Sequence, residues 1–238
     1  MPLNVVVIFF EIVVLILAFS IHECAHAWAA MRLGDPTAMM LGRVTLNPLK
    51  HLDPLGSIVF PLISLVYGGY LIGWAKPTPV TGRNFKNYKR DDILVTLAGP
   101  ASNLLSATIA LILLIFIKHA LPGGLVSIAT AVAIAQHVPG VATDGLPALF
   151  PIALFLYFVI FINLLLFVFN LIPLPPLDGG HFLPYLLPPR WGSPLHSLEQ
   201  FGPLLLLLLV MSGGTRYIID PLYRRVVLAY IALLRAIL

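Results

Sequence analysis

The residues best suited to chemistry in this sequence are His22, Glu23 and His26, which form an HExxH pattern. On an α-helix, where successive residues turn by about 100°, the two histidines lie one turn apart on the same face, with Glu23 beside them. Two neutral imidazoles can bind zinc and leave coordination positions open, while the neighbouring carboxylate can take a proton from water on the metal. The spacing therefore predicts a zinc site suited to hydrolysis.

The surroundings of the motif strengthen this interpretation. A five-residue pattern with two free positions also arises by chance, so context is needed to support it. Here the motif lies within residues 13–31, a stretch that is otherwise strongly apolar. Titratable groups are costly in a membrane-like helix and mark a functional site there by default. Cys24, the one cysteine, can form no internal disulfide and is expected to be a small buried filler.

The composition indicates an integral membrane protein. Of the 238 residues, 59% are hydrophobic and 10% are charged, and the mean hydropathy is +0.97. A typical soluble domain has about 25% charged residues, and a soluble fold of this size could not hide so much apolar surface. The lipid bilayer is therefore an expected partner. No nucleic-acid partner is expected, because basic loops on the cytoplasmic side account for the net charge of +4.

Four long apolar stretches exceed the roughly 20 residues that a spanning helix needs. They are residues 2–31, 54–75, 93–117 and 145–177. A fifth stretch, residues 200–215, is shorter and contains glycine and proline, so it could be a short span or a re-entrant piece. The first stretch has no basic segment before it and no cleavage site before the motif, so we expect it to remain as a span.

The distribution of basic residues predicts the orientation. Between the first span and residues 93–117 the chain carries most of its basic residues (Arg32, Arg43, Lys50, Lys76, Arg83, Lys86, Lys89 and Arg90). This region is therefore expected on the cytoplasmic side, which puts the motif in the cytoplasmic half of the bilayer. Residues 54–75 have basic flanks on both sides, so we expect a re-entrant or surface element between extended pieces at residues 42–46 and 74–80.

Asp178 is the candidate for a third ligand. It follows an apolar helix that Pro173, Pro175 and Pro176 should end, and it precedes Gly179 and Gly180. Such a break can turn a carboxylate toward a metal. An ordinary Asp-Gly turn at the water interface is the alternative. The charges of Zn²⁺, Asp178 and Glu23 sum to zero, which favours pairing this segment with the HExxH motif.

Three motifs together give the chain a resemblance to the site-2 proteases, the intramembrane zinc metalloproteases of peptidase family M50. They are HECAHA at residues 22–27, GPASN at 99–103 and NLIPLPPLDGGH at 170–181, in the family's order. The resemblance implies one zinc ion bound by His22, His26 and Asp178. It also implies Glu23 as general base and acid, Asn170 near the scissile carbonyl, and transmembrane proteins as substrates.

The resemblance also implies a core of three spans, and together with the apolar stretches it sets the expected fold. We expect an all-α polytopic protein of about five to six membrane segments, with a three-helix catalytic core (residues 2–31, 93–117 and 149–172) and short re-entrant or β-like elements near the active site. The expected organisation is one membrane-embedded domain over residues 1–238, with the core at about 2–185 and accessory segments at 198–238. We expect the cell membrane as its location. No hydrophilic stretch is long enough for the PDZ or CBS domains that many relatives carry, and the oligomeric state stays open.

Four other polar residues have open roles. Asn103 could make a helix-packing hydrogen bond or contact substrate. Asn170 could cap carbonyls freed by the prolines or donate to an oxyanion. His181 could support a metal ligand or sit at the interface, and Glu11 could face a polar cavity or lie near the outer surface.

A peptidase of this kind must open a substrate helix before attack, because a transmembrane helix hides its carbonyls in its own hydrogen bonds. An extended edge at residues 42–47 or 74–80 is the candidate to hold the opened strand. Two other functions stay open: a transporter that uses the His/Glu/Asp cluster as an ion or proton site, and a non-catalytic scaffold for membrane helices. The intact Glu23 argues against the scaffold.

Overall fold

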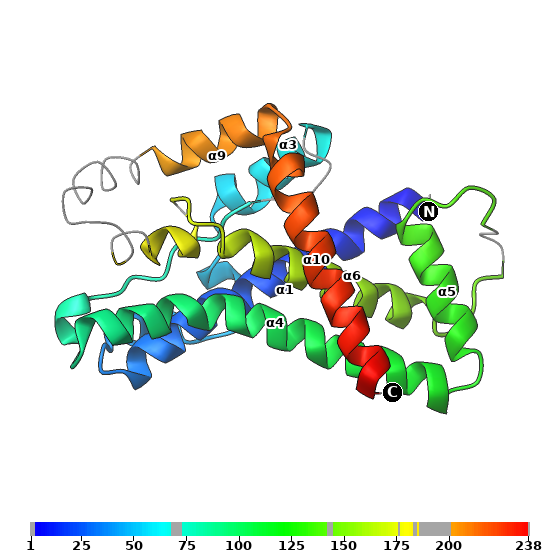
Figure 1. The fold of residues 1–238 in the computed structure, drawn as a ribbon, viewed down its shortest axis with the longest axis horizontal. Coiled ribbons are helices and arrows are strands. Elements are labelled where there is room, and N and C mark those ends of the chain that lie inside the picture. The colour runs from blue at the N-terminus through cyan, green and yellow to red at the C-terminus, as the bar shows by residue number, and fades with distance from the viewer. Residues whose placement is uncertain are drawn as a thin grey trace.

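The computed structural model describes residues 3–67, 73–141, 145–175, 177–182, 185 and 201–237. Within these ranges the chain is helical and no strand is assigned, which confirms the all-α prediction. Among the described residues, three helices are long and apolar enough to cross a membrane: α1 (Leu3–Arg32), α4 (Tyr88–Ala120) and α6 (Phe150–Asn170). They coincide with the three spans of the predicted core and pack against one another (Figure 1).

Each spanning helix ends where its sequence requires. α1 stops before Gly34, which has φ of +110° and is followed by Asp35-Pro36. α4 begins after Asn87, whose side chain accepts a hydrogen bond from the Arg90 amide, and it continues through Pro100. α6 begins with Pro151 in its first turn and ends at Asn170, just before the prolines that the sequence analysis identified as helix breakers.

α6 is the central helix of the bundle. In its most apolar window 61% of the residues are buried, against 39% for α1 and 33% for α4. Its buried side chains, among them Leu154, Phe158 and Ile162, pack with Leu15 of α1 and Leu114 of α4 in the main hydrophobic cluster. α6 therefore fixes how the other two spans lie, and with them the side chains that they carry.

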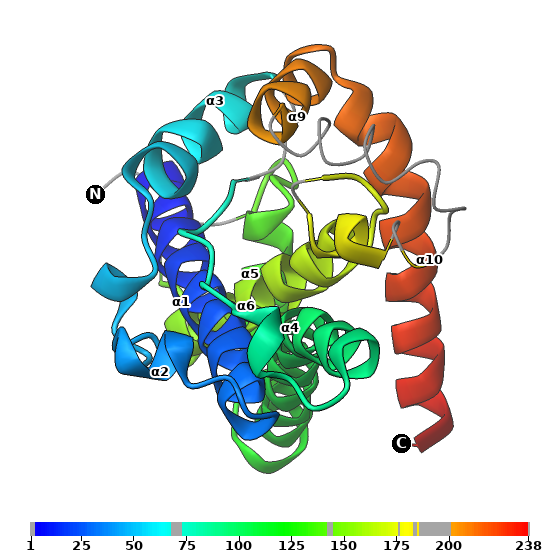
Figure 2. The same cartoon turned by 90° about the vertical axis from the view of Figure 1, so that its left-hand side faces the viewer.

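Shorter helices surround this core. α5 (Gly124–Ala135), which the sequence analysis did not anticipate, packs against α4 and α6. Near the end of α1 lies α2 (Thr37–Met40). α9 (Gly202–Met211) contacts α3 (Phe60–Tyr67), and the two lie side by side in Figures 1 and 2. α10 (Gly214–Ile237) runs along the outside against α6.

The stretch at residues 54–75 forms a π-helix (Leu55–Val59) and then α3, which at eight residues is too short to cross a bilayer. Residues 68–72 lie outside the described part of the chain. The chain then runs without regular secondary structure from residue 73 to residue 81. Residues 42–46 and 74–80 are thus irregular, and the expected β-like pairing is not assigned in the described residues. Whether residues 54–75 re-enter the membrane stays a prediction.

Candidate metal centre

α1 brings His22 and His26 onto one face, as their four-residue spacing predicts. The two Nε2 atoms lie 3.0 Å apart and the rings meet edge to face. Both histidines are buried, with 5% and 8% of their surfaces exposed. Two imidazoles buried this close together in an apolar bundle need a further polar partner, because a buried polar atom without one is costly.

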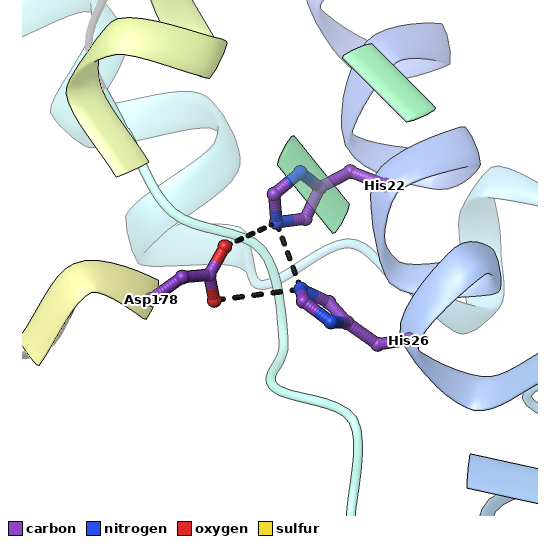
Figure 3. Close-up of side chains that lie close together, drawn as sticks. All are labelled: His22, His26 and Asp178. Atoms are coloured by element: carbon purple, nitrogen blue, oxygen red, sulfur yellow. Dashed lines mark hydrogen bonds and ion pairs between the residues drawn. The ribbon is translucent and has the colours of Figure 1, made fainter. Parts of the chain in front are cut away.

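Asp178 is that partner. It begins a short 3₁₀ helix (Asp178–Phe182) after α6 has ended, and its carboxylate points at the two rings (Figure 3). Oδ2 lies 3.1 Å from Nε2 of His22, and Oδ1 lies 3.4 Å from Nε2 of His26. Gly179 lets the 3₁₀ helix pack closely against the residue that follows α6, because a Cβ at position 179 would lie 2.6 Å from the carbonyl oxygen of Leu171. The structure therefore brings together the three side chains that the sequence analysis named as ligands.

A chain of buried amides determines the tautomer of His22. The carbonyl of Val159 can only accept, so the Asn163 side chain places its nitrogen there at 2.8 Å and turns its oxygen toward Asn103. The nitrogen of Asn103 donates to that oxygen at 2.8 Å, which leaves the Asn103 oxygen 2.6 Å from Nδ1 of His22. Nδ1 of His22 must then carry the proton, and Nε2 is left with a free lone pair.

His26 is fixed in the same way by a backbone group. Its Nδ1 lies 2.8 Å from the carbonyl oxygen of Val95 in α4, which can only accept a hydrogen bond. Nε2 of His26 is thus also unprotonated when the ring is neutral. This is the arrangement that metal-bound histidines show: the outer nitrogen donates to a carbonyl or amide, and the inner nitrogen faces the metal.

The lone pairs of three side chains therefore converge without a donor among them, and this suits a cation. The His22, His26 and Asp178 ligand atoms all lie within 4.8 Å of one another. Their contacts of 3.0, 3.1 and 3.4 Å are close to the roughly 3.3 Å between neighbouring ligands of a tetrahedral zinc ion, given bonds of about 2.0–2.1 Å. Oδ2 of Asp178 is buried and lacks a hydrogen-bond donor among the described residues. The donor set fits zinc, with room for a further ligand.

Gly99 gives the two rings their space on the side of α4. A Cβ at this position would lie 2.6 Å from Nε2 of His22 and would also collide with Nε2 of His26. Gly99 and Asn103 both belong to the GPASN motif and are one turn apart on the same helix face. The motif thus contributes both an open surface and a hydrogen-bond acceptor to the metal centre.

Glu23 lies beside the cluster, 8% exposed. The hydroxyl of Thr78 is 2.7 Å from its Oε2, and Nη2 of Arg43 is 4.0 Å from the same oxygen. The carboxylate faces a cavity of about 800 Å³ that His22, His26 and Asp178 also line. An anionic group that can hold a proton therefore stands next to the metal ligands, in a space large enough for part of a peptide chain.

The other candidates from the sequence lie nearby. Asn170 and His181 both line the cavity, and Asn170 donates to the Leu166 carbonyl at 3.0 Å in its own helix. One proton of that amide remains for another acceptor, so a role near a scissile carbonyl stays a prediction. Half-buried Glu11 lies three turns before the motif in α1. Sequence reasoning missed Asn163, Val95, Thr78 and Arg43, although an asparagine in so apolar a helix as α6 was a signal.

The sequence of the chain matches a family model, that of peptidase family M50, over residues 10–210. The matched region contains every residue of the candidate centre. The chain belongs to peptidase family M50. Family membership and the three apolar helices together make it a membrane metalloprotease, and they confirm the resemblance to the site-2 proteases.

Named relatives agree with the family. The chain is 38% identical over 211 residues to a Bacillus subtilis protein provisionally named zinc metalloprotease YwhC, with 89% of this chain and 84% of the relative covered. It is 29% identical over 224 residues to the Mycolicibacterium smegmatis protein provisionally named zinc metalloprotease Rip2, with 93% and 75% covered. No solved structure matches the chain at a significant level. These names imply zinc as the metal, which agrees with the donor set described above.

Proposed function

We propose that the protein is an intramembrane endopeptidase of the site-2 type that holds one zinc ion per chain through His22, His26 and Asp178. The observation that supports this most directly is the convergence of the three ligand atoms within 4.8 Å, with His22 and His26 inside a helix long enough to cross the membrane. A soluble metalloprotease has no need to place its ligands in such a helix. The arrangement therefore favours peptide bonds within or near the bilayer as the substrate.

A zinc ion held by His22, His26 and Asp178 would supply Lewis-acid chemistry, which would polarise a scissile carbonyl and lower the pKa of a water molecule. Glu23 accepts the proton of the attacking water at its carboxylate and later returns it to the leaving amine. Thr78 already occupies Oε2, so we assign the transferred proton to Oε1. Asn170, on the wall of the same cavity, is assigned the oxygen that develops negative charge at the substrate carbonyl.

The proposed substrates are transmembrane or membrane-anchored proteins. The cavity has a polar floor at the metal ligands and includes apolar side chains such as Phe19, Leu177 and Leu206 in its walls. A segment of locally unwound helix could lie there with its carbonyls exposed to the site. The irregular residues 74–80 form part of the wall, which supports the expectation that they contact the opened chain.

The proposed setting is the cell membrane, with the active site toward the cytoplasm. The chain between the predicted spans at residues 2–31 and 93–117 carries most of the basic residues. His22 and His26 lie in the second half of α1, toward the end that leads into this basic region. We propose that residues 1–238 act as one membrane-embedded domain. α3, α9 and α10 then supply the re-entrant or additional membrane segments that bring the total to five or six.

The function is tested with Glu23→Gln, which keeps the size of the side chain but cannot take the proton. The purified variant and the wild type are reconstituted in liposomes with a membrane-embedded reporter. We expect wild-type cleavage and a fall of at least about a hundredfold in the variant, the lower end of general-base contributions. Zinc content and thermal unfolding should match the wild type.

Glu11→Gln is the matched control, since Glu11 lies in the same helix but outside the cavity wall. Its cleavage rate should equal that of the wild type. Cleavage by Glu23→Gln at the wild-type rate, in a preparation free of other proteases, would refute the mechanism. A transporter would lose ion coupling in Glu23→Gln with no reporter cleavage in either protein, and a scaffold would show no proteolysis at all.

A further inference from the structure

The carboxylate of Glu23 depends on one neighbour for its orientation. Thr78 is the one hydrogen-bond donor to it among the described residues, with its hydroxyl 2.7 Å from Oε2 and 3.1 Å from the Glu23 backbone oxygen. A hydroxyl has one proton to donate, and the shorter contact takes it. Glu side chains have three rotatable bonds, so this contact selects one rotamer out of several.

The backbone around Thr78 is held rigidly by its neighbours in sequence. Pro77 and Pro79 fix φ on both sides, and a residue that precedes proline is driven to an extended conformation. Earlier in the segment, the Trp74 amide donates to the Gly56 carbonyl at 3.1 Å and the Lys76 amide donates to the His51 carbonyl at 2.7 Å. Thr78 therefore stands on a segment with little freedom to move.

Arg43 holds the same segment by hydrogen bonds to its backbone carbonyls. Its buried guanidinium, 5% exposed, donates to the carbonyls of Lys50, Lys76 and Pro77, the last at 3.0 Å. The planar fork of arginine suits three fixed carbonyls in a way that the lysine ammonium cannot match. Arg43 thereby links residues 43–50 to the chain just before Thr78, and it places a positive charge 4.0 Å from Glu23.

Asp35 binds the part of the segment that follows Thr78. Its fully buried carboxylate accepts hydrogen bonds from the Thr81 amide and the Asn84 side chain, each at 2.7 Å. The segment is thus anchored to the rest of the protein on both sides of Thr78 by groups other than its hydroxyl. The hydroxyl is not needed as a tether, and what it does uniquely is contact Glu23.

We propose that Thr78 is a positioning residue for catalysis, whose hydroxyl fixes the Glu23 carboxylate beside the metal ligands, and that Arg43 holds the segment that carries it. The inference rests on the proposed function, because it gives Glu23 its role as base. Its consequence is a division of labour: α1 supplies the base, and residues 74–81 supply its orientation.

Activity gives the first test. Thr78→Val keeps the branched shape and loses the hydroxyl, while Thr78→Ser keeps the hydroxyl. We expect Thr78→Val to lower kcat about tenfold to a hundredfold, the effect of a misplaced catalytic group, with KM within about twofold. Thr78→Ser should restore kcat to within about threefold of the wild type. In a Glu23→Gln background, Thr78→Val should change the residual rate by less than about twofold.

A spectroscopic test does not depend on activity. The sequence contains three glutamates, Glu11, Glu23 and Glu199, so ¹³C-glutamate labelling with a Glu23→Gln difference spectrum isolates the infrared carboxylate band of Glu23. Loss of a hydrogen bond should shift that band in Thr78→Val and leave it in place in Thr78→Ser. Thr108→Val is the matched control, because the Thr108 hydroxyl donates within α4 to the Leu104 carbonyl.

The outcomes separate the two ideas. Wild-type cleavage together with an unchanged kcat or an unshifted Glu23 band in Thr78→Val would overturn the positioning role and leave the proposed function standing. Loss of zinc or of folding in Thr78→Val, or an equal loss of rate in the Glu23→Gln background, would make Thr78 a structural residue and also overturn it. A band that shifts in Thr78→Val, together with a wild type that cleaves no reporter, would retain the contact and reject the proposed function.

Discussion

The side-chain oxygen of Asn103 lies 2.6 Å from Nδ1 of His22, although the asparagine belongs to α4 and the histidine to α1. Asn103 is fully buried, and Asn163 of α6 holds its amide nitrogen at 2.8 Å. All three spanning helices thus meet in one hydrogen-bonded chain that ends at a candidate metal ligand. The ring of His22 is oriented by the packing of the bundle and not by α1 alone.

We therefore expect Asn103→Leu to weaken zinc binding. Removing the partner of the outer nitrogen of a metal-bound histidine costs about 10-fold to 100-fold in metal affinity. The measurement is competition with a chelator of known affinity, on protein in detergent. Ser106→Ala is the control, since that hydroxyl donates to the Ser102 carbonyl one turn away in α4. Equal affinities in the wild type and Asn103→Leu would show that the contact does not orient His22.

Gly99→Ala should damage the same centre by steric contact. In a helix interior, alanine normally stabilises the protein relative to glycine by up to about 1 kcal/mol. A variant damaged by this change would therefore show the opposite of the usual effect. The added Cβ would meet both Nε2 atoms, and α4 would have to move away from α1. We expect zinc content after dialysis to fall well below that of the wild type. Ala101→Ser, on the exposed side of the same helix, should keep its zinc.

Replacement of each ligand tests the metal assignment directly. Wild-type protein should carry about one zinc per chain by elemental analysis, and His22→Ala, His26→Ala and Asp178→Ala should each lose it. His181→Ala should retain the zinc, because His181 is exposed on the cavity wall and is not part of the ligand cluster. Stoichiometric zinc in all three ligand variants would remove the assignment.

The elements of this fold that follow from local sequence were predictable. Long apolar runs predicted α1, α4 and α6, although α4 contains Pro100, and the prolines after Asn170 predicted the break that presents Asp178. The HExxH spacing puts both histidines on one face of a single helix turn, so this part of the site needs no contact between distant segments. α5 was missed because a 12-residue apolar helix is too short to resemble a span.

The contacts that complete the site could not be predicted, because they depend on how distant segments pack. Asn103 follows His22 by 81 residues, and Thr78 follows Glu23 by 55. No local period relates such positions. Arg43 illustrates the limit: it was counted as one of the basic residues of a cytoplasmic loop, yet it is buried and bound to backbone carbonyls. Counting charges says nothing about which of them find partners inside the protein.

The orientation of the chain is tested by cysteine labelling from each side of the membrane, in a Cys24→Ser background. Lys86→Cys should be labelled from the cytoplasmic side, since it lies in the basic segment before α4 and is exposed. Gln136→Cys, exposed after α5, should be labelled from the opposite side. Asn87 is left intact because it caps α4. Labelling of Lys86→Cys from outside would invert the proposed topology.

The pH dependence of folding should reveal the role of Asp35. Burial acts to raise the pKa of this carboxyl, but hydrogen bonds from Thr37, Thr81 and Asn84 outweigh it, and the pKa lies below its ordinary value of 3.8. Because the folded-state pKa is the lower one, the stabilisation is fully present above the unfolded value. It is lost as the pH falls from there through the folded-state pKa.

Asp35→Asn does not titrate, so the difference in unfolding temperature between it and the wild type isolates this group. An asparagine can supply one acceptor oxygen, but its NH₂ group would face either the Thr81 amide or the donors at Oδ1. We expect the variant to be less stable at pH 6 by about 1–3 kcal/mol, the cost of an unsatisfied buried donor. The difference should hold down to about pH 5 and shrink progressively below pH 4, where the wild-type carboxyl starts to be protonated. Loss of zinc in acid affects both proteins and cancels in the comparison. A difference that stays constant from pH 6 to pH 3 would show that the charge of Asp35 does not stabilise the segment that carries Thr78.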